Sequence, residues 1–212
     1  MHNTLQLLIA TNNRGKMLEI QSILQDLAIE LLSPADLGLQ LQVLEDGKSY
    51  AANAEKKAIA FAHASGMVAL ADDSGLEVDA LDGAPGLHSA RYSPLENATD
   101  KDRREFLLAQ LAGKPRPWTA RFRATIAVAA PNGEVHLEEG LCSGEIIPEE
   151  RGESGFGYDP IFQLKGMGVT MAQLAMEEKN RLSHRGHALR KTIPVLIDIL
   201  GLEKRAGRNR GK

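Results

Sequence analysis

The sequence of 212 residues lacks most of the features that define specialised classes of protein. Its one cysteine, Cys142, cannot form an internal disulfide, which fits a reducing cytoplasm, and the scattered histidines give no zinc-ligand spacing. No apolar run approaches the roughly 20 residues that a membrane-spanning helix needs. Residues 1–10 also lack the charged start and long apolar stretch of a signal peptide. We therefore expect a cytoplasmic protein that does not bind a membrane.

Basic residues are too few for general binding to nucleic acid. The formal net charge is −3, and residues 203–212 alone hold five basic residues and one acidic residue. The rest of the chain has 20 basic and 27 acidic residues, a formal charge of −7. Because nucleic-acid binding depends on many contacts of Lys and Arg with phosphate, we expect no nucleic-acid partner. Residues 203–212 have no apolar face, and we expect them to form a disordered tail rather than an RNA-binding arm.

The sequence does have the composition and patterning of an α/β protein. Hydrophobic residues make up 43% of the chain and charged residues 25%, as in an ordinary globular domain. Helices are predicted at residues 17–27, 49–65, 100–111 and from Ser183 onward. Strands are predicted at residues 5–10, 28–33, 67–73, 118–130 and 134–147, with a hairpin turn between the last two. The pattern predicts one domain at residues 1–202, with a mixed sheet and flanking helices.

The segment Thr11-Asn12-Asn13-Arg14-Gly15-Lys16 lies where the first strand ends and the first helix begins. Free N–H groups and the positive end of the helix dipole attract anions at such a place, and Lys16 could reach a phosphate. The segment is not a Walker A loop, because Ala10 and Met17 stand where that motif needs glycine and Ser or Thr. Taken alone, it is explained equally well as a helix cap with a surface lysine.

Two adjacent acids, Asp72 and Asp73, end the strand predicted at residues 67–73, and Ser74 follows. Acids beside a buried strand are costly unless they are paired or bound to a cation. At the carboxyl end of a strand they would face the crevice in which open α/β sheets bind ligands, and Mg²⁺ suits such a site. Neighbouring strand residues point to opposite faces, so the two acids need not share a role. A cap or turn is the alternative interpretation.

Glu45 precedes a second candidate group. Ser49 can cap the following helix, on which Asn53 and Lys57 share one face. The side chains on this face could bind a phosphate or a metal-bound water. Taken alone, however, the pattern is more typical of a solvated surface.

Two segments in the C-terminal half suit recognition of a flat ring. In Ser154-Gly155-Phe156-Gly157-Tyr158-Asp159, glycines permit close approach of the backbone, aromatic rings can stack on a base, and the acid can accept hydrogen bonds from ring N–H groups. An aromatic-anchored loop is the alternative. Residues 177–186 end at another helix N-terminus, where His184 and Arg185 favour ligand recognition over capping. The first half of residues 177–186 is also compatible with a run of charged residues on the solvated surface.

Together these segments resemble the inosine triphosphate pyrophosphatase family, the dITP/XTP pyrophosphatases that cleanse the nucleotide pool. The resemblance covers about residues 7–200 and rests on five segments in family order, TNNRGK, the Glu45 segment with NAEKKA, ADDSGLEVDAL with GAPGLHSARY, SGFGYDPIF, and EEKNRLSHRG. It implies an elongated mixed β-sheet with flanking helices and two lobes around a nucleotide cleft. It also implies a homodimer that depends on Mg²⁺ and hydrolyses dITP, ITP, XTP or dXTP to the monophosphate and pyrophosphate.

The matching motifs also imply roles for individual residues. They imply that residues 11–16 bind the triphosphate and that Glu45 and Asp73 bind Mg²⁺, with Asp73 also acting as the general base. They also imply further contacts of the substrate with Ser74, Lys57 and Lys179. The purine base is expected to contact Phe156, Gly157, Tyr158, Asp159, His184 and Arg185. The tail at residues 203–212 lies outside the resemblance.

Three other interpretations stay open on the sequence alone. A related pyrophosphatase could remove modified pyrimidine or methylated nucleotides, although FGYD and SHRG argue against it. A regulator could bind a nucleotide without turnover, and the basic tail could associate with RNA. For the favoured interpretation, donors from Arg185 and loop N–H groups would pair with the oxygen at C6 of inosine or xanthosine and would reject the amino group of adenosine.

Overall fold

A computed structural model describes residues 5–202, and the tail predicted at residues 203–212 lies outside them. The strands are β1 (Leu5–Ile9), β2 (Ile29–Leu32), β3 (Ala69–Val78), β4 (Trp118–Ala129), β5 (Val135–Ile146) and β6 (Phe162–Leu164). They form one open sheet in the order β2-β1-β3-β4-β5-β6. β1 pairs in parallel with β2 and β3, whereas all later pairs are antiparallel. The predicted mixed sheet is therefore confirmed.

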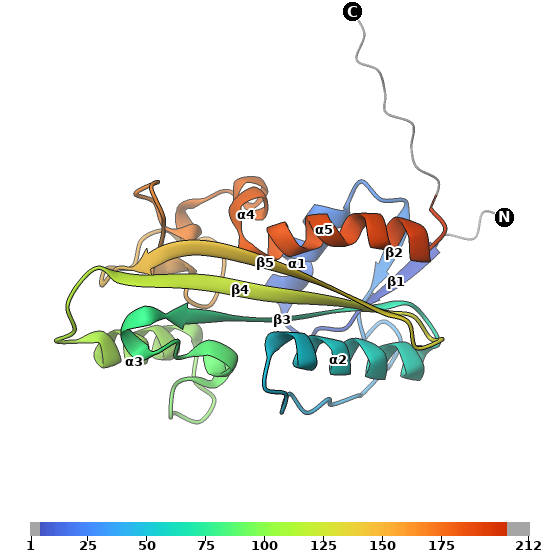
Figure 1. Ribbon diagram of the computed structural model, residues 1–212, viewed down its shortest axis with the longest axis horizontal. Coiled ribbons are helices and arrows are strands. Elements are labelled where there is room, and N and C mark those ends of the chain that lie inside the picture. Colours follow the sequence, from blue (N-terminus) through green and yellow to red (C-terminus); the bar gives the residue numbers. More distant parts are fainter. Residues whose placement is uncertain (1–4, 203–212) are drawn as a thin grey trace, which may run out of the picture.

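Five helices flank this sheet among the described residues. They are α1 (Arg14–Leu24), α2 (Tyr50–Ser65), α3 (Asp100–Leu111), α4 (Met176–Leu182) and α5 (His184–Ile199). Figure 1 shows α2 and α3 on one side of the long strands β3 to β5, and α4 and α5 on the other. Side chains cap α2 and α5 as predicted, because Ser49 accepts from the N–H of Ala52 and Ser183 from that of Gly186. Within residues 5–202, no helix combines the length and apolar character that a membrane crossing requires.

The prediction that a strand ends at Asp72 and Asp73 is wrong. β3 continues to Val78, because the residues after Asp73 pair with β4 as far as Val78 opposite Ala120. β1 is the strand that stops, with Ile9 opposite Leu70. The two acids therefore lie in the middle of a long strand, beyond the end of its shorter neighbour. This step in the sheet places the start of α1 beside them.

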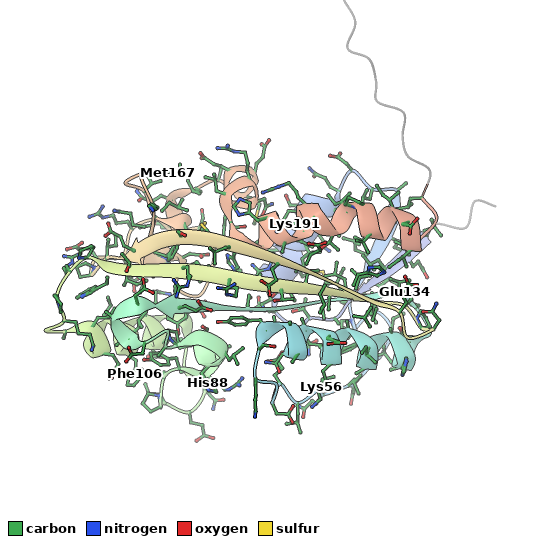
Figure 2. All side chains as sticks on the ribbon, in the orientation of Figure 1. Lys56, His88, Phe106, Glu134, Met167 and Lys191 are labelled. Carbon is green, nitrogen blue, oxygen red and sulfur yellow. The ribbon has the colours of Figure 1, made fainter. Side chains whose placement is uncertain are left out.

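Apolar residues form three clusters around the sheet. Near β1, one cluster packs α1 and α5 on one face, and an alanine-rich cluster packs α2 on the other, where Ala54 and Ala58 are fully buried. The small alanine side chains let α2 lie close to the strands, while its charged residues such as Lys56 face solvent (Figure 2). The third cluster lies at the other end of the long strands, where Leu107 and Leu111 of α3 belong to the same core as Trp118 and Phe162.

Candidate active site

One pocket collects side chains from segments that are far apart in the sequence. Its lining comes from the start of α1, the segment before α2, the middle of β3, the loop at residues 154–159 and the junction of α4 and α5. The predicted site residues that line it are Asn13, Lys16, Glu45, Asp73, Ser74, Phe156, Gly157, Tyr158, Asp159, Lys179, His184 and Arg185. The predicted residues outside this lining are Thr11, Asn12, Arg14, Gly15 and Lys57.

The start of α1 forms one end of the pocket. Asn13 caps the helix, because its Oδ1 accepts from the backbone N–H of Lys16 at 3.0 Å, and Thr11 Oγ1 accepts from the N–H of Asn13 at 3.1 Å. A Cβ atom on Gly15 would lie 2.4 Å from the ring of Phe156, so glycine here permits close contact with the loop at residues 154–159. With its free N–H groups and Lys16, this helix start suits an anion such as a phosphate.

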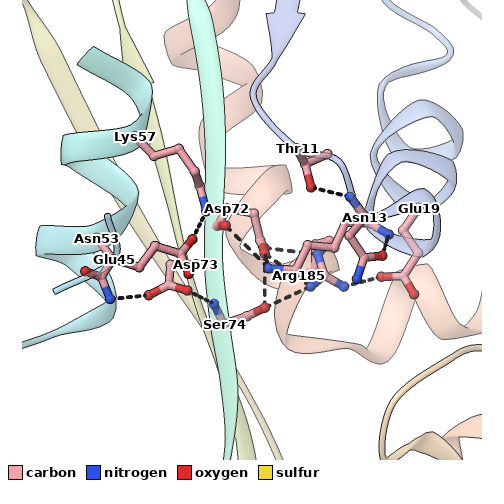
Figure 3. A network of polar contacts seen from close by, with 11 residues as sticks. Thr11, Asn13, Glu19, Glu45, Asn53, Lys57, Asp72, Asp73, Ser74 and Arg185 are labelled. Atoms are coloured by element: carbon pink, nitrogen blue, oxygen red, sulfur yellow. Dashed lines mark hydrogen bonds and ion pairs between the residues drawn. The ribbon is translucent and has the colours of Figure 1, made fainter. Parts of the chain in front are cut away.

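Glu45 and Asp73 form a pair of carboxylates in the same pocket. Asn53 on α2 donates to Asp73 Oδ2 at 3.0 Å, and Lys57 Nζ lies 2.6 Å from Glu45 Oε1 (Figure 3). Burial raises the pKa of Asp73, and the negative charge of Glu45 adds to this effect. Burial alone would raise the pKa of Glu45 too, but the ion pair with Lys57 outweighs it and lowers that pKa.

These two carboxylates fit Mg²⁺ that is shared with a bound ligand. Mg²⁺ typically takes one or two protein carboxylates and completes its shell with waters and substrate phosphates. A cation would also relieve the repulsion that helps to raise the pKa of Asp73. Among residues 5–202, no cluster of three or more His, Cys, Asp or Glu side chains is placed to hold a metal ion. The donor set therefore suits a phosphate-bound Mg²⁺ and not an ion held by protein alone.

Asp72 points to the other face of β3, as the alternation of strand residues predicts. Its carboxylate lies 2.5 Å from Lys16 Nζ and 3.0 Å from Arg185 Nε, and it accepts from Ser74 Oγ at 3.0 Å (Figure 3). Burial would raise the pKa of Asp72, but the charges of Arg185 and Lys16 overcome it and hold the pKa below its ordinary value. Asp72 is therefore a permanently charged partner for two cations.

Glu19 on α1 supports two of the residues that line the pocket, and the sequence did not point to it. It is 1% exposed, and its two oxygens lie 2.6 Å from Lys179 Nζ and 2.5 Å from Arg185 Nη1. Lys179 also lies 2.5 Å from Asp159 Oδ2, so these ion pairs join the middle of α1 to the loop at residues 154–159. The only signal in the sequence is its spacing of four from Ile23, which places it at the border of the apolar face of α1.

Aromatic rings line another part of the pocket. His184 stacks on Phe122 with ring centroids 4.8 Å apart and planes 12° apart. Burial, together with the charge of Arg185, lowers the pKa of His184 well below its ordinary value, so the ring is neutral at neutral pH. Its Nδ1 has no hydrogen-bond partner among the described residues. A neutral ring in this position can donate to or accept from a planar ligand.

Arg185 is more deeply engaged than the sequence analysis expected. The residue is 2% exposed, and four of its N–H groups already donate, to Asp72 twice, to Ser74 and to Glu19. A guanidinium has five N–H donors, so a single Nη1 hydrogen is left without a partner within the described part of the chain. The recognition of a base oxygen by Arg185 stays a prediction, and it would have to use that hydrogen or the backbone.

The sequence profile of the Ham1 family matches residues 7–195. The chain belongs to the Ham1 family. A dITP/XTP pyrophosphatase of Desulfotalea psychrophila is 51% identical over 183 residues, which are 86% of this chain and 81% of that protein. One of Desulforamulus reducens is 48% identical and covers 91% of this chain and 96% of its own.

A solved structure agrees with the Ham1 assignment. The HAM1 protein of Coxiella burnetii is 38% identical and superposes with a TM-score of 0.82, over 92% of this chain and 99% of that chain. The family resemblance and the fold class inferred from the sequence are therefore confirmed.

The Ham1 pocket also contains residues that the sequence analysis did not assign. They come from the segment before α3 and from its first turn, and they include Ser89, Arg91, Asp100 and Arg103. Ser89 and Arg91 lie in GAPGLHSARY, a segment that carries the family resemblance but to which no site role was assigned. Asp100 and Arg103 lie in the first turn of the predicted helix at residues 100–111, where the sequence does not distinguish them from surface charges.

Proposed function

We propose that this chain is a nucleoside triphosphate pyrophosphatase that hydrolyses dITP, ITP, XTP and dXTP to the monophosphate and pyrophosphate. One observation carries the proposal: a single pocket is lined by carboxylates, by Lys16 beside a helix start and by aromatic rings. We assign the helix start and the carboxylates, the phosphate end, to a triphosphate, and the aromatic rings, the base end, to a base. The name dITP/XTP pyrophosphatase, which the relatives at 51% and 48% identity carry, supports the same substrates.

Asp73 is the proposed general base. Hydrolysis of a phosphoanhydride needs an aligned water and neutralised charge more than it needs a covalent intermediate. The carboxylate of Asp73 is held by Asn53, and its raised pKa makes it a better proton acceptor than an ordinary aspartate. Lys16 and Lys57 supply positive charge from two sides. Mg²⁺, when bound by Glu45 and Asp73, neutralises phosphate charge and makes a bound water more acidic.

The base would be selected at the aromatic end. Inosine and xanthosine present an oxygen at C6, which only accepts hydrogen bonds, whereas adenosine presents an amino group. A donor from His184 or the remaining Nη1 hydrogen of Arg185 would pair with that oxygen. An adenine amino group in the same place would leave a buried donor unpaired, and such a mismatch rejects a ligand strongly.

The resemblance to the family also supports a homodimer, and the acidic body supports the absence of a nucleic-acid partner. We propose a cytoplasmic location, because a free nucleotide substrate and a single cysteine both fit that compartment. Light scattering on the purified protein tests the homodimer, and a monomeric mass at micromolar concentration would contradict it.

Release of pyrophosphate from ITP tests the proposed reaction. With Mg²⁺, purified protein should form IMP and pyrophosphate in equal amounts, and Asp73→Asn should lose about 10²- to 10⁴-fold of the rate. Asp26→Asn, an exposed aspartate on the surface, is the matched control and should keep full activity. Binding of ITP without turnover would favour the regulator, and a preference for modified pyrimidine or methylated nucleotides would favour the related enzyme.

A further inference from the structure

Helix α3 holds the middle of the loop at residues 154–159 through Asp100, which lines the pocket, and Arg104, which does not. Both backbone groups of Gly157 bond to this helix: the N–H donates to Asp100 Oδ2 at 2.7 Å, and the carbonyl accepts from Arg104 Nη1 at 2.9 Å. Asp100 and Arg104 are four residues apart and so share one face of α3. Two side chains of one rigid helix therefore fix one peptide plane on each side of Gly157.

Arg104 is itself held in a fixed geometry. Its Nε and Nη2 donate to the two oxygens of Glu150 at 2.8 and 2.9 Å, and the residue is 9% exposed. Glu150 lies in the segment that leads from β5 into the loop. The planar guanidinium thus joins three parts of the chain, which are α3, Glu150 and Gly157. A lysine could not reproduce this forked contact.

The loop depends on such external contacts. Gly152, Gly155 and Gly157 have φ angles of +84°, +77° and +62°, and glycine is the residue with the greatest backbone freedom. Within the loop, the N–H of Phe156 donates to Asp159 Oδ2 at 2.9 Å. That bond joins the side chain of Asp159 to the loop backbone, and the ion pair of Asp159 with Lys179 ties the end of the loop to α4, but neither contact holds the peptide groups of Gly157.

We propose that Arg104 is a positioning residue for base selection, acting with Asp100 through the backbone of Gly157. Arg104 does not line the pocket, whereas Gly157, Phe156 and Asp159 do. Its bond to Gly157 sets the width of the base end, so that a mismatched base cannot be accommodated by a shift of the loop. The phosphate end, with Lys16 and Asp73, lies on other elements. The inference rests on the proposed function, because it assigns the loop to the base.

Steady-state kinetics of Arg104→Gln with ITP and ATP test this role. We expect KM for ITP to rise about tenfold while kcat stays within about twofold, because the phosphate end is unchanged. KM for ATP should change little, so the preference for ITP should also fall about tenfold. Arg104→Lys, which keeps the charge and loses the fork, should lie between Arg104→Gln and the wild type. Glu150→Gln should shift the preference in the same direction by less.

Arg121→Gln is the matched control. Arg121 forms an ion pair with Glu77 at 2.7 Å elsewhere on the sheet, and neither residue lines the pocket, so its loss should leave the preference for ITP unchanged. If Arg104 has only a structural role, its variants should have a lower kcat for both nucleotides by the same factor, or a lower Tm, while KM and the preference for ITP stay unchanged. Either of these results in both Arg104→Gln and Arg104→Lys would overturn the inference.

Equilibrium binding of IMP and AMP gives a second measurement that needs no turnover. If the chain binds a purine nucleotide but releases no pyrophosphate, the proposed reaction fails while the ratio of Kd for AMP to Kd for IMP still reports on the loop. That ratio should fall about tenfold in Arg104→Gln. An unchanged ratio would overturn the inference whatever the fate of the proposed reaction.

Discussion

Replacing Arg185 by alanine removes a guanidinium that joins two buried carboxylates. Arg185, Asp72 and Glu19 are each 2% exposed or less. Removing one partner of a buried ion pair costs about 3–5 kcal/mol, because it leaves a buried charge without compensation. Here each carboxylate keeps one cation, since Lys16 lies 2.5 Å from Asp72 and Lys179 lies 2.6 Å from Glu19. We therefore expect a loss of about 3–4 kcal/mol from the free energy of unfolding.

Thermal unfolding measures this loss. For a chain of this length, 1 kcal/mol shifts Tm by about 2–4 °C, so Arg185→Ala should melt about 6–16 °C below the wild type. The control is Arg121→Ala, because the side chains of Arg121 and its partner Glu77 are 37% and 17% exposed. A pair as accessible as this contributes about 0–1 kcal/mol, so the control should shift Tm by about 4 °C or less.

Acid provides an independent check on the same network. Arg185 and its neighbouring cations lower the pKa values of Asp72 and Glu19, so both carboxylates add stability above their ordinary pKa values near 4. That stability is lost as the pH falls through their lowered values. Arg185→Ala should therefore lose less stability than the wild type between pH 7 and pH 3 in urea titrations. A Tm within about 2 °C of the wild type, with an unchanged acid dependence, would refute the reasoning.

Three further predictions concern the phosphate end. Glu45→Gln should raise the Mg²⁺ concentration needed for half-maximal rate, measured by titration at saturating ITP, and an unchanged requirement would remove Glu45 from the metal site. Lys16→Ala should raise KM for ITP more than it raises Ki for IMP, because Lys16 sits at an anion-binding helix start; equal losses would assign it to folding or to the base. The value of kcat/KM for ITP should fall as acid protonates Asp73 in the free enzyme, at a higher pH than for an ordinary aspartate because burial raises its pKa, and Glu45→Gln should shift this acidic limb of the pH profile to lower pH.

Periodicity and caps were sufficient to predict most of the fold. The helix predicted at residues 100–111 is α3, and the Ala-rich pattern at residues 49–65 gives α2 with Ser49 as its cap. The end of β3 was not predictable in the same way. Asp, Ser and Gly in succession favour a turn, because they bond to nearby backbone or tolerate unusual φ angles. Pairing with β4, which is distant in the sequence, outweighed that local preference.

Glu19 and Arg104 show why part of the site could not be predicted. On its helix, each looks like a surface charge, and only its partner distinguishes it. Those partners are remote, since Glu19 bonds to a residue 166 positions away and Arg104 to one 46 positions away. The ordered motifs located the pocket because each motif carries its chemistry within a few residues. The supporting ion pairs follow from the packing of the sheet and helices, which no short motif encodes.

The adjacent acids of β3 show how strand geometry separates two roles. Asp72 points toward α5 and is paired with Arg185 and Lys16, so its pKa is lowered and it stays charged. Asp73 points toward α2, where burial and Glu45 raise its pKa. Two carboxylates whose surroundings move their pKa values in opposite directions are suited to different tasks, one as a fixed counter-ion and one as a proton acceptor. The same alternation places Arg185 on the other face of β3 from Asp73. The charges of Lys16 and Lys57 oppose the rise in the pKa of Asp73 without cancelling it, and this difference in surroundings is the physical reason to propose Asp73, and not Asp72, as the general base.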